Sequence, residues 1–121
     1  MNFDAFRSKL ESELMKYNFV KEDYVFNTSF ILGDFVLYTV EHRFDKKDIW
    51  YRNTLRGYMN RVMFDEHLET TQKEWDKVTD SISKVLKEYK SYLVKTKIDE
   101  LEKDFKWVKI LKHSVKNLKN N

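Results

Sequence analysis

The chain has 121 residues, of which 41% are hydrophobic and 36% are charged, and its formal net charge is only +3. A chain of this length and apolar content can bury a core of its own, which argues against disorder and indicates a single domain over residues 1–121. It has no cysteine, no proline and two glycines, so disulfides, thiolate sites, cysteine nucleophiles and Gly-rich phosphate loops are excluded. No apolar run is long enough to span a membrane, so we expect no membrane span. The absence of cysteine fits a reducing cytosol, so we expect a cytoplasmic protein.

The first 18 residues are predicted to form a helix. Phe3, Phe6, Leu10, Leu14 and Tyr17 follow the spacing of one helical face. Asn2 is the expected N-cap, and Asn18 is expected to close the helix in the left-handed conformation.

Residues 24–64 are predicted to form the sheet region, after a connection at residues 21–23. Residues 24–26, 30–32 and 35–40 are rich in β-branched and aromatic residues, and Gly33-Asp34 is a hairpin signal. The segment after that turn is expected to alternate, with one face formed by Val36, Tyr38, Val40 and Phe44 and the other by Phe35, Leu37 and Thr39. A second turn at residues 45–48 predicts a further strand from residue 49, although residues 49–64 also fit a helical spacing. Both alternatives stay open.

Residues 71–118 are predicted to form the C-terminal helices. Thr71 to Glu74 has the form of a capping box, and an apolar stripe runs from Trp75 to Leu93. A second stripe begins at Ile98, and the nine residues from Tyr89 to Ile98 rotate a helical face by about 180°. We therefore expect a break at residues 95–97, capped by Thr96, that folds a second helix back as an antiparallel hairpin. A single long helix completed by a second subunit, in a homodimer, is the alternative.

Together these elements predict an α+β fold with an N-terminal helix, a small antiparallel sheet of two to four strands, and C-terminal helices over one sheet face. The expected core consists of Phe6, Leu10, Phe30, Leu37, Val40, Trp75, Ile82, Leu86, Leu101 and Phe105.

A cluster of arginines and aromatic residues is the main candidate for a binding surface. Four of the five arginines fall between Arg43 and Arg61, and residues 49–64 contain no acid. Arginine and amphipathic aromatic residues dominate binding hot spots and also grip phosphates or stack on bases. The candidate binding residues of this segment are Arg43, Trp50, Tyr51, Arg52, Arg56, Tyr58 and Arg61. The alternative is that the aromatic side chains belong to the core and the arginines are solvated.

The C-terminal tail provides a second basic zone. Residues 95–121 carry a net charge of +4, and lysines recur there at helical spacing opposite an apolar face. Such a face docks on nucleic acid, on anionic membranes or on acidic protein grooves, although it is more often simply solvated. The candidate residues are Lys106, Lys109, Lys112 and Lys116.

No catalytic, metal or cofactor motif is present. His42, His67 and His113 are isolated, and no serine lies in a nucleophile elbow. We therefore expect a non-enzymatic binding protein without a metal or cofactor.

Three binding roles remain open. A small domain with an arginine–aromatic cluster and a lysine-rich composition resembles accessory proteins of phages and mobile elements, among them anti-CRISPR and other anti-defence proteins. This resemblance implies an inhibitor that binds a larger protein or nucleoprotein complex sterically. Direct binding of RNA or single-stranded DNA is the first alternative, and a self-assembling structural role is the second.

Overall fold

A computed structural model describes residues 1–64 and 72–104. The chain divides into a first unit, Met1–Tyr89, and a second unit that begins at Lys90. In chain order the elements are α1 (Phe3–Met15), β1 (Val20–Asp23), β2 (Asn27–Leu32), β3 (Phe35–His42), β4 (Lys47–Arg52), β5 (Met59–Met63) and α2 (Gln72–Asp104). The predicted α+β class is confirmed, whereas the expected number of strands is wrong, because the sheet has five.

Helix α1 begins where the sequence predicts, but it ends at Met15 rather than at residue 18, and Tyr17, expected on its apolar face, lies beyond it and is 44% exposed. The Asn2 side chain accepts a hydrogen bond of 2.8 Å from the backbone N–H of Ala5, which satisfies one of the free donors at the helix start. Asn18, three residues beyond the helix, has a φ of 64°, the left-handed conformation that asparagine tolerates. The apolar face of α1 is buried at Phe3, Phe6, Leu10 and Leu14.

The five strands form an antiparallel meander in the order β1-β2-β3-β4-β5. Gly33, with a φ of 59°, and Asp34 form the predicted hairpin turn between β2 and β3. The prediction for the first strand is wrong: β1 is Val20–Asp23, where a connection was expected, and residues 24–26 form the turn to β2. The uncertainty over residues 49–64 is removed, since they contain the rest of β4, a loop and β5.

A register shift in the β2–β3 pair changes the expected alternation of β3. The shift lies where Phe30 pairs with Tyr38 and Ile31 pairs with Val36, so Leu37 is an extra residue in the ladder. Leu37 and Tyr38 are consequently both fully buried, while Val36 is exposed. The regular alternation expected for this segment is therefore interrupted at Leu37.

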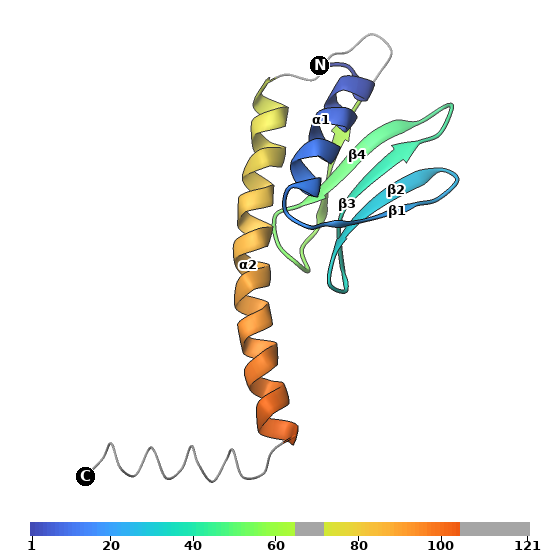
Figure 1. The fold of residues 1–121 in the computed structure, drawn as a ribbon. Coiled ribbons are helices and arrows are strands. Elements are labelled where there is room, and N and C mark those ends of the chain that lie inside the picture. The colour runs from blue at the N-terminus through green and yellow to red at the C-terminus, as the bar shows by residue number, and fades with distance from the viewer. Residues whose placement is uncertain (65–71, 105–121) are drawn as a thin grey trace, which may run out of the picture. The chain divides into compact units, whose positions relative to one another are not determined.

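The core of the first unit lies between the sheet and two helical segments. Figure 1 shows α1 and the first part of α2 on the same side of the sheet. The rings of Phe6 and Trp75 join the two helices edge to face, with centroids 5.1 Å apart. The Tyr38 hydroxyl lies 2.8 Å from Ser81 Oγ, so strand β3 and helix α2 also share a buried hydrogen bond.

Seven of the ten expected core residues are buried, from Phe6 to Ile82 in sequence. Leu86 is only half-buried because Val85 occupies that turn of the core, and Leu101 is exposed. Phe105 lies outside the described residues.

The expected helical hairpin is wrong, because α2 is one helix of 33 residues that runs through residues 95–97 without a break. Thr96 is an interior residue of α2 rather than a cap. The segment contains neither glycine nor proline, and its lysine, glutamate and leucine residues are good helix formers. A change in phase of the apolar stripe does not by itself interrupt a helix. Thr71, the expected cap at the start, lies outside the described residues.

Candidate functional site

The arginine–aromatic segment is distributed over both ends and both sides of the sheet. Arg43 lies in the β3–β4 turn, whereas Arg56 and Tyr58 lie in the β4–β5 loop. These two connections flank the six residues of β4, so they are separated by about 20 Å. The structure therefore does not bring the predicted residues into one surface. The four tail lysines, Lys106, Lys109, Lys112 and Lys116, lie outside the described residues.

Trp50 and Arg61 lie side by side on the sheet face opposite the helices. They are cross-strand partners, and the Arg61 guanidinium lies 5.6 Å from the centroid of the Trp50 ring. The Trp50 indole N–H donates to the carboxylate of Glu41 on β3, which lies opposite Asp48 in the ladder. Both side chains therefore have intramolecular partners.

Asp48 provides the anion of this group. Its side chain is 3% exposed, and its Oδ2 lies 2.8 Å from Arg61 Nη2. That oxygen has no well-aligned hydrogen bond among the described side chains, so the contact is an ion pair rather than a hydrogen bond. Because burying an unpaired carboxylate is costly, Arg61 has a structural role in neutralising Asp48.

Tyr51 belongs to the core. It alternates with Trp50 along β4, and only 6% of its surface is exposed. Burial raises the pKa of its phenol. The hydroxyl faces the helices, so a partner on the open sheet face would not reach it.

The β4–β5 loop carries exposed residues on either side of one buried residue, Leu55. Leu55 is buried, and its backbone N–H donates a hydrogen bond of 2.8 Å to Glu88 of α2. The Leu55 carbonyl accepts a hydrogen bond of 3.3 Å from Arg52. The Arg56 guanidinium lies 5.7 Å from the centroid of the Phe35 ring, while Tyr58 is 95% exposed. Tyr58 is thus the one predicted aromatic residue that is fully available to a partner.

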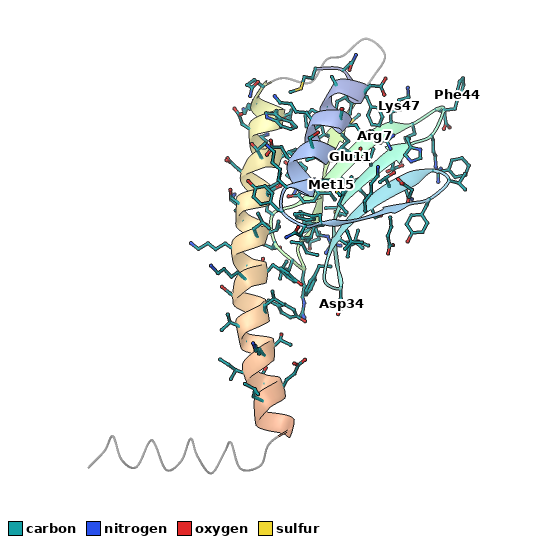
Figure 2. All side chains as sticks on the ribbon, in the orientation of Figure 1. Arg7, Glu11, Met15, Asp34, Phe44 and Lys47 are labelled. Atoms are coloured by element: carbon teal, nitrogen blue, oxygen red, sulfur yellow. The ribbon has the colours of Figure 1, made fainter. Side chains whose placement is uncertain are left out.

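A second exposed cluster lies at the opposite end of the sheet, where the β1–β2 and β3–β4 turns meet. We call it the hairpin-end surface, and it consists of Tyr24, Val25, Phe26, Arg43 and Phe44. Val25 is 82% exposed, and Phe44 is as exposed as in an extended chain, at 104%. Figure 2 shows the Phe44 side chain projecting from the end of the sheet, with Asp34 of the β2–β3 turn at the other end.

Short-range contacts hold the two turns of the hairpin-end surface together. The backbone N–H of His42 donates a hydrogen bond of 3.0 Å to the Phe26 carbonyl, which ties the β1–β2 turn to β3. The Arg43 guanidinium lies 5.2 Å from the Phe26 ring centroid, so it links the second turn to the first. The Tyr24 hydroxyl donates to Glu22 at 2.6 Å, and this hydrogen bond raises the pKa of the phenol. The apolar side chains are therefore exposed on an ordered backbone.

Sequence reasoning included only Arg43 of this surface. Residues 24–26 are apolar and aromatic, which favours a strand, and the spacing of Phe44 from Val40 favours a place on the face of the preceding strand. The available signal was the charged run Lys21-Glu22-Asp23. Charged residues are typical of an exposed edge strand, and a strand here would have placed residues 24–26 in the turn.

The described residues contain no group of three or more His, Asp or Glu residues that could hold a metal ion. No helix in the described part of the chain is long and apolar enough to cross a membrane.

Comparisons with protein-family models, with curated proteins and with solved structures find no match to this chain.

Proposed function

We propose that the chain is a non-enzymatic binding protein that docks on a larger protein or nucleoprotein complex through the hairpin-end surface. The observation that supports this proposal is the exposure of four large apolar side chains at one end of the sheet, with Phe44 and Val25 almost entirely in solvent. Single exposed apolar residues are ordinary, but a contiguous aromatic group on an ordered backbone is typical of an interaction site.

The charges around this surface favour a protein contact over a phosphate backbone. Residues 22–26 and 43–47 contain three cations and three acids, so their net charge is zero. The cations have partners within the chain: Arg43 contacts Phe26, Lys46 lies 3.7 Å from Glu41, and Lys47 contacts Phe3. Nucleic-acid affinity depends on cations that replace counterions at phosphates, and this neutral surface offers few.

The mode of action that fits such a surface is steric. A rigid apolar patch with short side-chain anchors binds without a large cost in conformational entropy. A small domain held in this way covers a neighbouring site on its target, as anti-defence proteins of phages do. We therefore retain the inhibitor hypothesis, with the hairpin-end surface as its contact.

The proposal is tested by affinity capture from cells in which the protein occurs, with matched variants. Phe44→Ala removes an exposed ring at the hairpin end, and Tyr58→Ala removes an equally exposed ring at the opposite end of β4. Neither ring is buried, so both variants should have the same free energy of unfolding as the parent. We expect Phe44→Ala to lose a protein that the parent and Tyr58→Ala retain. A protein lost with Tyr58→Ala and kept with Phe44→Ala would refute the proposed surface.

Direct nucleic-acid binding is tested separately with labelled single-stranded RNA and DNA over a salt titration. Our proposal predicts no submicromolar binding. Tight binding that weakens steeply with salt and is lost in the double variant Arg52→Ala, Arg56→Ala would instead support the nucleic-acid alternative, because each lost phosphate contact lowers the salt slope by about one.

A further inference from the structure

The charges around the hairpin-end surface are separated into two halves of opposite sign. Residues 22–26 contain two acids and no cation, whereas residues 43–47 contain three cations and one acid, so the two segments carry −2 and +2. All residues of both segments are exposed. The zero net charge of this surface is therefore the sum of an acidic half and a basic half.

The strand order places these halves on opposite sides of the exposed apolar residues. The two acids lie on β1, and the two lysines lie at the start of β4, three strands away in the sheet. At about 4.8 Å per strand, the halves are about 14 Å apart. Val25 of the first turn and Phe44 of the second lie between them.

On the open face of the sheet, the two halves contribute Glu22 and Lys46. Glu22 is the ladder partner of Ser29, in the row that continues across the sheet to Trp50. The Lys46 ammonium lies 3.7 Å from the carboxylate of Glu41, which accepts the hydrogen bond of the Trp50 indole. Both charged side chains therefore lie on the side of the sheet that α1 does not cover.

On the helix-covered face, the corresponding residues are Asp23 and Lys47. The Asp23 carboxylate accepts a hydrogen bond of 2.8 Å from the hydroxyl of Thr28, which also contacts Arg7 of α1. The Lys47 ammonium lies 5.9 Å from the centroid of the Phe3 ring of α1. Each acid of one half thus has a lysine of the other half as its counterpart on the same face.

A surface with this layout is complementary to itself. A two-fold axis along the normal of the sheet reverses the strand order but keeps each face in place, so the acidic half of one copy lies against the basic half of the other. A two-fold axis in the plane of the sheet, along the row of turns, would place like charges together. The charges therefore select one arrangement of two copies, in which the sheets meet end to end.

We propose that two copies of the chain pair through the hairpin-end surface about this axis. Glu22 of one copy faces Lys46 of the other, and Val25 faces Phe44, so each contact occurs twice. The dimer covers the surface that docks on the target, so dimerisation and target binding exclude each other. This regulatory consequence rests on the proposed function, whereas the dimer itself follows from the layout of the surface.

The test is sedimentation equilibrium of the purified full chain, without any target, at concentrations up to about 1 mM. We expect a reversible dimer of the 14.9 kDa chain. It should be weak, because a contact between two pairs of turns is small compared with the roughly 1,600 Å² of a stable interface.

Charge reversals test the arrangement of the two copies. Glu22→Lys and Lys46→Glu should each weaken dimerisation by about tenfold or more, because each makes both attractive contacts repulsive. Mixed in equal amounts, the two variants should pair with each other about as tightly as the parent pairs with itself, since each supplies the charge that the other has lost. Lys84→Glu is the matched control, because it makes the same change of charge at an exposed position of α2.

Circular dichroism shows whether each variant remains folded, and Phe44→Ala, which should also weaken the dimer, tests the contact without any change of charge. A parent that stays monomeric up to about 1 mM would overturn the proposal. So would a dimer that Lys84→Glu weakens as much as the two reversals do, or a mixture of the two reversals that fails to restore pairing.

These outcomes are distinguishable from a failure of the proposed function, because sedimentation needs no target. A monomeric parent would remove the dimer and leave the proposed docking surface in place. A target that is lost with Tyr58→Ala and kept with Phe44→Ala would refute the proposed function and leave the dimer in place.

Discussion

The hydrogen bond between Tyr38 and Ser81 gives the sharpest stability prediction, because the two residues are fully buried and join strand β3 to helix α2. Ser81 Oγ also donates a hydrogen bond of 2.5 Å to the Val78 carbonyl. The serine proton is therefore used, and the Tyr38 hydroxyl must be the donor to Ser81. Burial raises the pKa of this phenol far above its usual value, so it is protonated at neutral pH.

This donor assignment predicts unequal effects for the two single substitutions. Tyr38→Phe removes the hydroxyl but leaves Ser81 bonded to Val78, so the free energy of unfolding should fall by about 1 kcal/mol. Ser81→Ala leaves a buried hydroxyl without an acceptor, which costs about 2 kcal/mol, offset by about 0.5 kcal/mol from the better helix propensity of alanine. The double variant has no orphaned group and should lose only about 0.5 kcal/mol, less than either single variant.

Urea unfolding of the four proteins, followed by circular dichroism, measures these differences directly. The coupling energy between the two sites should be about 2 kcal/mol. If the two single effects add in the double variant, the residues do not interact in solution, and the packing of α2 on β3 described above is wrong.

Three further predictions concern stability in the first unit. Gly33→Ala should lower the free energy of unfolding in urea by about 1–2 kcal/mol. The φ of 59° strains a residue that has a Cβ, and that Cβ would lie 2.7 Å from the Tyr89 hydroxyl. An unchanged free energy of unfolding would mean that the β2–β3 turn has another backbone conformation. Asn2→Ala should cost about 1 kcal/mol through loss of the N-cap, and Asn2→Asp should restore it. Arg61→Ala should cost about 1–3 kcal/mol at neutral pH because Asp48 loses its ion-pair partner, and the loss should shrink in the Asp48→Asn background; equal losses in both backgrounds would show that the pair contributes nothing.

The sequence predicted the elements whose local signals agree with their surroundings. The apolar spacing of α1, its Asn2 cap and the Gly33-Asp34 turn each have one strongly favoured conformation, so no tertiary contact was needed to choose it. The first strand was misplaced because β1 is an exposed edge strand. Its residues Lys21, Glu22 and Asp23 carry no buried face, and strand propensity therefore favoured the aromatic turn that follows.

The wrong prediction of a hairpin in α2 and the separation of the arginine–aromatic residues have a common origin. The phase of an apolar stripe says where a helix needs a partner, but not whether the chain or a second molecule supplies it. Ile98 and Leu101 were therefore assigned to a folded-back helix. In the same way, the pattern of Arg43 to Arg61 gave the residue types of a binding surface without their positions. The turns on either side of β4 send Arg43 and Tyr58 to opposite ends of the sheet.

The affinity of the captured protein partner for the parent, Phe44→Ala and Tyr58→Ala tests the central claim most directly. If the hairpin-end surface is the contact, Phe44→Ala should weaken binding by about 30-fold or more, which corresponds to the 2 kcal/mol of a hot spot. Tyr58→Ala should change the affinity by less than about threefold, and salt should have little effect on the parent, since the surface has no net charge. Unchanged affinity of Phe44→Ala, with a large loss in Tyr58→Ala, would contradict the account and return the binding site to the β4–β5 loop.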